Sequence, residues 1–136
     1  MLNDATRAAL SAGNLAHLVT LNPDGSPQLS VVWVGVDGDD IVLAHLGGGQ
    51  KIKNLRRDPR VSLSMATGGR NEAGLDYYLI VHGRAAVADG GGPELLQRLA
   101  HVYLGPDVTF PPPGAPPGVV VRITAERVGG VGPWTG

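Results

Sequence analysis

The stretch Leu15-Ala-His-Leu-Val-Thr-Leu21, followed by Asn22-Pro-Asp-Gly25 and then by Pro27 to Val36, decides the fold class of this chain. A β-prone run enters a proline followed by Asp-Gly, which is a strong turn signal, and a Val-rich run returns from it. This order predicts a β-hairpin. A second turn at Asp37-Gly-Asp-Asp40 and a third run at Ile41 to Leu46 extend the hairpin by one more strand.

Three further strand patterns follow. Arg60 to Ala66 alternates apolar and polar side chains with the period of a half-buried strand. Asp76 to Ala88 indicates a long strand with a kink at Gly83, and Val119 to Ile123 indicates a last strand that continues toward Val128. Short helices and loops separate these strands; the predicted helices are Asp4 to Ala12, Gln50 to Arg57 and Glu94 to Leu104, and the predicted loops are Gly68 to Gly74 and Phe110 to Pro117. We therefore expect a mainly β fold, a six-stranded antiparallel barrel with short flanking helices, in a single domain over residues 1–136.

The composition excludes several classes of function. Hydrophobic residues make up 43% of the chain and charged residues 17%, which excludes disorder. The absence of cysteine excludes disulfides, thiolate catalysis and thiolate-bound metals, and the scattered histidines show no ligand spacing, so no metal site is predicted. A net charge of −1 and an aromatic content of 4% argue against nucleic-acid binding. Because the chain shows no signal-peptide core and no apolar run of about 18–20 residues, we expect a cytoplasmic protein that does not bind membranes.

One motif carries chemistry: the glycine-rich loop Gly47-Gly-Gly-Gln-Lys51, which ends where a helix begins. The first amides of a helix lack internal partners and carry partial positive charge, so they favour an anion. Lys53 adds charge beside these amides, and Arg56 or Arg57 can form a bidentate contact with phosphate oxygens. The spacing is neither that of a Walker loop nor that of a Rossmann fingerprint. From the residues alone, the motif is either an anion site or a glycine loop before a solvated helix face.

Five segments occur in an order that resembles a known family. They are Thr20-Leu-Asn-Pro-Asp-Gly-Ser-Pro-Gln28, Val31-Val-Trp33, Gln50-Lys-Ile-Lys-Asn-Leu-Arg-Arg-Asp-Pro-Arg60, Val81-His-Gly-Arg-Ala-Ala86 and Gly132-Pro-Trp134. Together they resemble the pyridoxamine-phosphate-oxidase-like, FMN-binding split-barrel superfamily, and more closely its F420-dependent oxidoreductase branch with the biliverdin-reducing members. The resemblance spans Leu10 to Trp134, and the segment from Lys51 to Arg60 is its most specific part.

The resemblance implies a split-barrel homodimer whose cofactor lies in a groove at the interface. The strand residues that would line the tricyclic ring are Gln28, Ser30, Val31, Val32 and Trp33. The residues that would meet the ribityl chain and the phosphate are His45, Leu46, Gln50 and Lys51, with Arg57 as a further phosphate or tail contact. The partner chain would supply Tyr77 or Tyr78 and Trp134. Gly49 stands where some relatives carry an arginine near the phosphate.

Three of these residues have alternative interpretations. In a Val-rich strand, Trp33 is either a core residue or a platform for the ring. Trp134 follows Gly-Pro near the chain end, where a core role is harder to defend, so we expect it to stack on a ligand or to contact a partner chain. His45 either bonds a ribityl hydroxyl or faces solvent. The sequence shows no Ser-His-Asp set and no paired carboxylates, so no catalytic side chain is predicted.

The expected function is an F420H2-dependent reductase that transfers a hydride to a conjugated organic acceptor, biliverdin-like or quinone-like. The cofactor carries that chemistry, and the protein supplies position and electrostatics. FMN shares the phosphoribityl group, so an FMN-dependent oxidase or reductase of the same fold is the alternative. The carboxylate-bearing tail of F420 would suit the cations Lys53, Arg56 and Arg57. A non-catalytic cofactor carrier is a third hypothesis.

Overall fold

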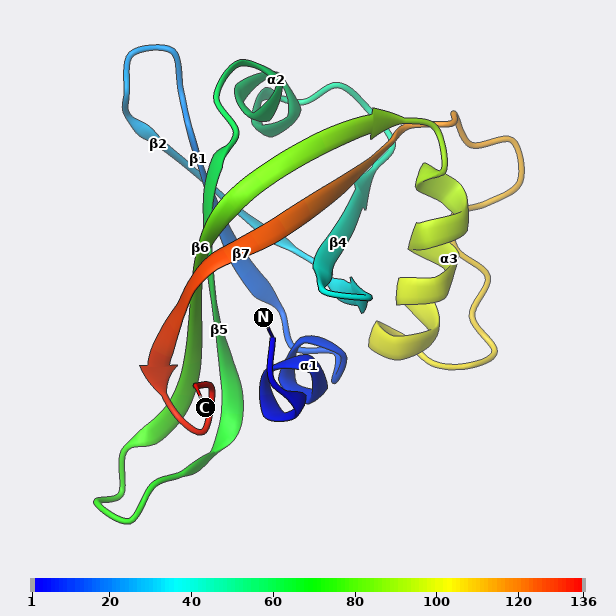
Figure 1. Cartoon of the computed structure of the whole chain (residues 1–136). Coiled ribbons are helices and arrows are strands. Elements are labelled where there is room, and N and C mark those ends of the chain that lie inside the picture. Colours follow the sequence, from blue (N-terminus) through cyan, green and yellow to red (C-terminus); the bar gives the residue numbers. More distant parts are fainter. Residues whose placement is uncertain (1, 136) are drawn as a thin grey trace.

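A computed structural model describes residues 2–135, and within them the chain forms one antiparallel sheet of seven strands with three helices (Figure 1). The strands are β1 (Ala16–Leu21), β2 (Pro27–Val32), β3 (Gly35–Asp37), β4 (Asp40–His45), β5 (Arg60–Arg70), β6 (Asp76–Asp89) and β7 (Val119–Val131). The helices are α1 (Asp4–Leu10), α2 (Gln50–Arg57) and α3 (Gly92–Tyr103). The strand order across the sheet is β2-β1-β5-β6-β7-β4-β3, so the two ends of the sheet are consecutive in sequence.

The first hairpin forms as the sequence predicts. β1 and β2 pair in an antiparallel register that sets Leu21 opposite Pro27. The Asn22 amide donates to the Ser26 carbonyl (2.9 Å), and the Asp24 carboxylate accepts from the Ser26 amide (3.0 Å) and hydroxyl (2.6 Å). Gly25 has a φ of 85°, a conformation that glycine adopts without steric cost. Local turn chemistry therefore fixes this hairpin.

The described residues contain seven strands, where the sequence predicts six, because the run from Pro27 to Val36 divides in two. β2 ends at Val32, and β3 starts at Gly35 and pairs with β4 instead of β1. Between them, the Val34 amide donates to the Tyr103 hydroxyl oxygen (3.0 Å), and that hydroxyl also lies 3.3 Å from the Val34 carbonyl oxygen. The backbone of Val34 thus bonds to helix α3 instead of a neighbouring strand.

The later strands are longer than predicted. β5 continues to Arg70 and takes up part of the predicted polar loop, and β7 continues to Val131. The predicted kink at Gly83 coincides with a shift in the β6–β7 register between His82 and Gly83. A Cβ at Gly83 would lie 2.2 Å from the Thr124 carbonyl oxygen, so the two strands approach there more closely than a side chain allows.

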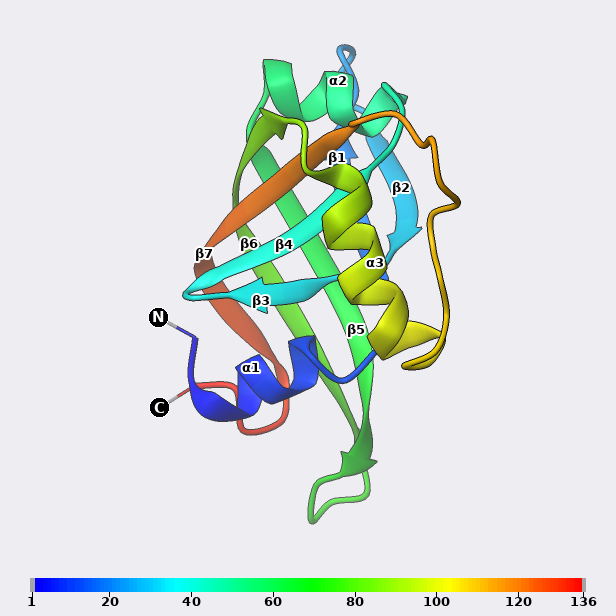
Figure 2. The ribbon, with the colours of Figure 1, turned by 90° about the vertical axis from the view of Figure 1, so that its right-hand side faces the viewer.

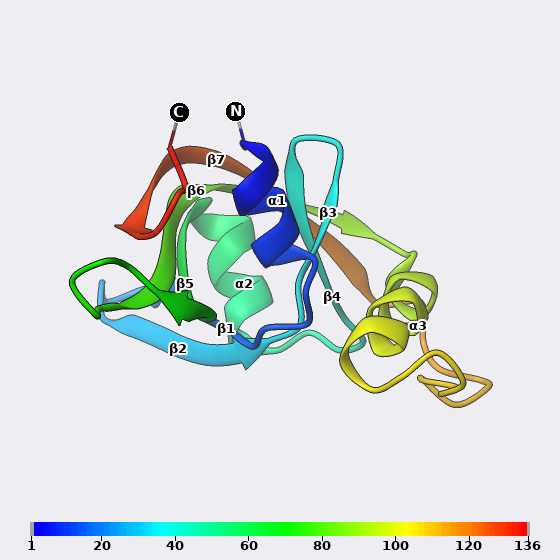
Figure 3. The ribbon, with the colours of Figure 1, turned by 90° about the horizontal axis from the view of Figure 1, so that it is seen from below.

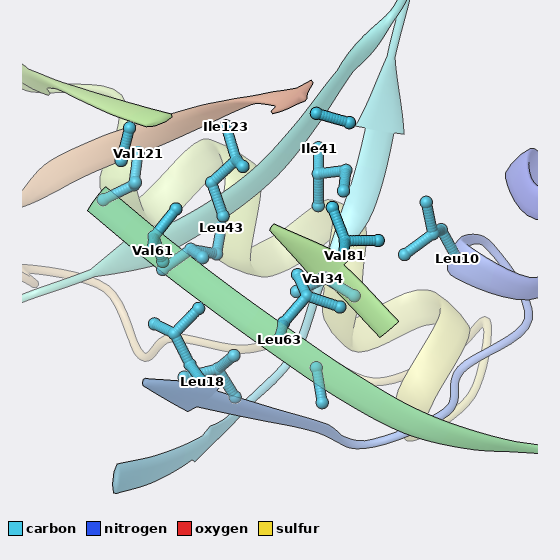
Figure 4. Packing of buried hydrophobic residues seen from close by; sticks show 14 of the residues in the cluster. Leu10, Leu18, Val34, Ile41, Leu43, Val61, Leu63, Val81, Val121 and Ile123 are labelled. Atoms are coloured by element: carbon cyan, nitrogen blue, oxygen red, sulfur yellow. The ribbon is translucent and has the colours of Figure 1, made fainter. Parts of the chain in front are cut away.

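The sheet bends around a single core, to which most of its strands contribute (Figure 4). Leu18 from β1, Leu63 from β5, Leu43 from β4 and Ile123 from β7 are at most 3% exposed. Helix α2 lies at one end of the sheet and α1 at the other, while α3 packs against β4 (Figure 2). Ile52 and Leu55 of α2 are buried, which confirms the predicted apolar stripe of this helix.

The two ends of the chain meet beside α1 (Figure 3). The Asn3 side chain donates to the Pro133 carbonyl (3.0 Å), and the Thr6 hydroxyl donates to the Trp134 carbonyl (3.1 Å). Within residues 2–135 no helix is long and apolar enough to cross a membrane. The same residues bring no three potential metal ligands of the His, Cys, Asp and Glu types together.

Candidate cofactor-binding site

Helix α2 presents an uncapped N-terminus with a lysine in its first turn. Gly49 is the N-cap residue, and no side chain bonds the free amides of the first turn. Lys51 is half-buried, and among the described residues no carboxylate pairs with it. Burial lowers the pKa of the Lys51 ammonium group, because a charge held partly out of water is less stable. This end of α2 therefore suits an anion, which would restore the missing opposite charge.

His45 orders the glycine loop that leads into α2. Its Nδ1 atom lies 3.0 Å from the Gly47 nitrogen and 2.7 Å from the Gly47 oxygen, so the ring bonds the loop backbone in either tautomer. The ring is half-buried. The sequence left two interpretations open for His45, a bond to a ribityl hydroxyl or exposure to solvent. The structure shows a third arrangement, in which the ring bonds the backbone of its own loop. The residue holds the loop in place next to Lys51.

A pocket of about 240 Å³ lies beside Lys51. It is lined by Val31, Val32, Trp33, Ala44, Lys51, Leu96 and Phe110. The structure thus brings four predicted site residues together and adds three that the sequence did not indicate. Among the described residues of this lining, Lys51 alone carries a charge, so the pocket is an apolar hollow with one cation.

Trp33 forms the aromatic floor of this pocket. Its ring stacks on Tyr103, with 5.3 Å between the centroids and 14° between the planes, and it meets Phe110 edge to face at 5.6 Å and 64°. Trp33 is half-buried, so both earlier interpretations hold in part: one side packs within the chain and another lines the pocket. Leu96 and Phe110 were missed because they lie on α3 and in the connection after it, more than sixty residues along the chain.

Gln28 and Ser30 lie on the other face of β2 from Val31. Side chains alternate along a strand, so these residues cannot all line one ring with their side chains. The Gln28 Oε1 and Ser30 Oγ atoms are buried, and within residues 2–135 they have no hydrogen-bond partner. Buried oxygen atoms without partners are unfavourable, so water or a ligand is the expected partner of both. Their role in a cofactor site stays a prediction.

Asn54 is a site-shaping residue that the sequence did not single out. It is fully buried, and its Nδ2 atom donates to Thr20 Oγ1 (3.1 Å) and Asn22 Oδ1 (2.9 Å). Its Oδ1 atom accepts from the side chains of Gln50 (2.8 Å) and Arg57 (3.3 Å). These bonds fix α2 to the first hairpin. The one available signal was a polar residue between the apolar positions Ile52 and Leu55.

Two of the three arginine and lysine side chains expected to meet a tail already have partners. The Arg57 guanidinium donates to the Leu21 carbonyl as well as to Asn54. Arg56 pairs with Asp89 at 2.7 Å. Lys53 has no ion-pair partner among the described residues. The structure thus gives Arg57 a role in holding α2 to β1, and its contact with a phosphate stays a prediction.

Trp134 is buried in the core of its own chain, so the expectation that a core role is hard to defend was wrong. It is 7% exposed, its Nε1 atom donates to the carbonyls of Tyr78 (2.8 Å) and Val131 (3.1 Å), and its ring meets Tyr77 edge to face. The reason is that the chain ends return to α1. Tyr78 itself is 42% exposed on the outer face of β6 and does not line the pocket of its own chain.

A second hollow of about 320 Å³ lies between α3 and β7. It contains Arg122, whose guanidinium is held by Asp37 (2.5 Å) and Asp40 (3.2 Å). The lining also carries Arg98 and Glu94, so its two arginines are matched by two carboxylates. Lys51 faces no such carboxylate among the described residues and therefore marks the better anion site.

An antiparallel barrel-like sheet with an uncapped helix N-terminus next to an aromatic pocket is the arrangement expected of one class of protein, the split-barrel oxidoreductases with flavin-type cofactors. The family model for pyridoxamine 5'-phosphate oxidase matches residues 2–132, and the chain belongs to this family. No curated protein matches the chain in sequence.

Three solved structures illustrate the likeness. An F420 reductase is 25% identical over 90% of this chain and 94% of its own, with a TM-score of 0.74. A conserved hypothetical protein from Mycobacterium tuberculosis is 29% identical over 98% of this chain and 85% of its own, with a TM-score of 0.73. HupZ from Group A Streptococcus shares the fold alone, at 17% identity over 99% of this chain and 98% of its own, with a TM-score of 0.67.

Proposed function

We propose that this protein is an F420H2-dependent reductase that transfers a hydride from the reduced deazaflavin to a conjugated organic acceptor. The observation that carries the proposal is Lys51, a half-buried cation with no carboxylate partner among the described residues. It lies at the uncapped N-terminus of α2 and at the edge of an aromatic pocket. This combination suits a ligand with a phosphate at one end and a flat ring at the other. The likeness to an F420 reductase supports the choice of deazaflavin.

The residues present fit such a cofactor. Lys51 and the first amides of α2 would hold the phosphate, and His45 keeps the loop beside them in place. Trp33 and Val32 would lie against the ring, and the unpartnered Ser30 hydroxyl offers a polar contact. When bound, the reduced cofactor supplies the hydride, and the matching proton comes from solvent. The pocket's apolar walls would exclude water from the reacting atoms.

A homodimer is part of the proposal. Leu29 and Val31 of β2 are 64% and 54% exposed, and Tyr78 of β6 is exposed on the same face of the sheet. Between these strands, the outward positions of β1 and of the middle of β5 carry uncharged side chains, and Arg60 at the start of β5 adds one charge at the edge of this face. The uncharged positions are His17, Val19, Leu21, Ser62, Ser64 and Ala66. A largely uncharged, partly apolar sheet face suits a two-fold contact with a second copy. Val31 lies both on this face and in the pocket lining, so the partner would border the site.

An FMN-dependent oxidase or reductase is the second candidate, and one observation favours it. Arg56 and Arg57 already bond Asp89 and Leu21, so fewer free cations remain for the carboxylate tail of F420. FMN needs the phosphate and ring contacts but no tail contacts.

Titration of the purified protein with F420 and with FMN at low ionic strength tests the choice. Tighter binding of F420, together with acceptor-dependent oxidation of F420H2, supports the first proposal. Tighter FMN binding supports the second candidate. Tight F420 binding without turnover of any quinone-like or tetrapyrrole acceptor would instead support a carrier.

A further inference from the structure

Half of the chain's aromatic side chains gather at the pocket: Trp33 and Phe110 line it, and Tyr103 stacks on Trp33. The chain has two Trp, three Tyr and one Phe, and Trp33, Tyr103 and Phe110 gather at this one place. They come from the end of β2, the end of α3 and the connection that follows α3. Aromatic residues are rare in this chain, and three of them lie together at the place where a flat ligand would bind.

Tyr103 holds Trp33 in place beside the pocket. Its hydroxyl accepts from the Val34 amide (3.0 Å) and donates to the Asn14 carbonyl (2.7 Å). Burial raises the pKa of the Tyr103 hydroxyl, so the group stays neutral and keeps its donor. Because the Trp33 ring stacks on the Tyr103 ring, these hydrogen bonds also fix the position of Trp33 beside the pocket.

Gln97 fixes Phe110. The Gln97 Nε2 atom donates to the Val108 carbonyl (2.8 Å), and its Oε1 atom accepts from the Phe110 amide (3.2 Å). One side-chain amide therefore bonds the connection at two points and ties it to α3. The connection is rich in proline and glycine, and these two bonds hold it against α3. The ring of Phe110 meets Trp33 edge to face as a result.

We propose that Phe110 is a specificity-determining residue of this pocket and that Gln97 is its positioning residue. Phe110 forms the wall against which the conjugated ring of the bound molecule lies, while Lys51 holds the anionic end. The lining, apolar except for Lys51, selects ligands that combine a flat ring with one phosphate. This inference rests on the proposed function and extends it to residues contributed by α3 and the segment after it.

The test separates ring binding from phosphate binding. Affinities for F420, FMN and inorganic phosphate are measured for wild type, Phe110→Ala, Gln97→Met and Gln97→Glu. Phe110→Ala weakens the binding of both tricyclic ligands by about tenfold, because an aromatic contact is lost, and leaves phosphate affinity unchanged. Gln97→Met weakens tricycle binding in the same direction. Gln97→Glu restores part of it, because the carboxylate still accepts from the Phe110 amide.

Leu104→Ala is the matched control, since it removes an exposed apolar side chain near the start of the same connection and outside the pocket lining. It leaves all three affinities unchanged. Equal tricycle affinity in wild type and Phe110→Ala overturns this inference, and so does a parallel loss of tricycle and phosphate binding, which would mean general damage. A wild-type protein that binds neither F420 nor FMN overturns the proposed function and this inference together.

Discussion

Replacing Lys51 with Met should weaken cofactor binding and, at the same time, stabilise the cofactor-free protein. Met keeps an unbranched apolar side chain in the half-buried position but carries no charge. A charge-assisted hydrogen bond to phosphate contributes about 1.5–3 kcal/mol, so its loss raises the Kd by about tenfold to about 150-fold. The stabilisation has a separate origin, because in the free protein this ammonium group is partly desolvated and no carboxylate among the described residues pairs with it.

The pH dependence of this stabilisation has a definite sign. Burial lowers the pKa of Lys51 in the folded chain, so the unfolded chain binds this proton more tightly. The resulting penalty on the wild type is fully present below the folded pKa and disappears as the pH rises past the unfolded pKa. The Met variant lacks the penalty. Its advantage in Tm is therefore present at pH 7 and shrinks in strongly alkaline solution.

Ligand titration and thermal unfolding of the cofactor-free protein, at pH 7 and at higher pH, measure both effects. Arg56→Met is the control, because it removes a positive charge from the same helix where Asp89 already engages that charge. We expect a much smaller change in Kd for this variant than for Lys51→Met, because Asp89 already engages the charge that it removes. An unchanged Kd in Lys51→Met would refute the phosphate role. A lower Tm of that variant at pH 7 would refute the conclusion that the charge of Lys51 destabilises the cofactor-free protein.

Three further predictions concern the tail, the sheet face and the core. Lys53→Ala should lower the affinity for F420 by up to about fivefold and leave that for FMN unchanged, and the difference should vanish in titrations at high salt, because exposed charges are screened. Leu29→Glu should convert the protein from dimer to monomer in sedimentation at low micromolar concentration, while Leu104→Glu should not; a dimeric Leu29→Glu protein would exclude this sheet face as the interface. Leu18→Ala should lower the free energy of unfolding in urea by about 2–5 kcal/mol, because Leu18 is fully buried, and a smaller loss would show that the core collapses around the cavity.

The structure reduces the charge preference for F420 over FMN that we expect from the sequence. Three cations near α2 were expected to meet the tail. The structure gives Arg56 and Arg57 partners within the chain and, among the described residues, shows no ion-pair partner for Lys53. One exposed pair contributes about 0.2–1 kcal/mol, which is at most about fivefold in affinity. We therefore expect the ring pocket to contribute more than the tail to the difference in affinity between the two cofactors.

Much of the fold could be predicted from the sequence because its signals are local. The turn at Asn22 to Gly25, the period-two strand after Arg60 and the apolar stripe of α2 all follow from preferences that span a few residues. The glycine loop with Lys51 belongs to this group too, because a helix N-terminus and the charge beside it are neighbours in sequence. The sequence alone thus determined the mainly β class, the approximate positions of the strands and the helix N-terminus that carries Lys51.

Only the tertiary structure decided how distant segments complete that site. The Val34 amide bonds the Tyr103 hydroxyl instead of a neighbouring strand, and the predicted strand from Pro27 to Val36 therefore divides into β2 and β3. The return of the chain end to α1 buries Trp134. Gln97 places Phe110 against Trp33. Each of these contacts joins residues far apart along the chain. The dihedral preferences and hydrophobic periods of a sequence act over one turn or one strand. They do not indicate which distant side chain will form a given hydrogen bond.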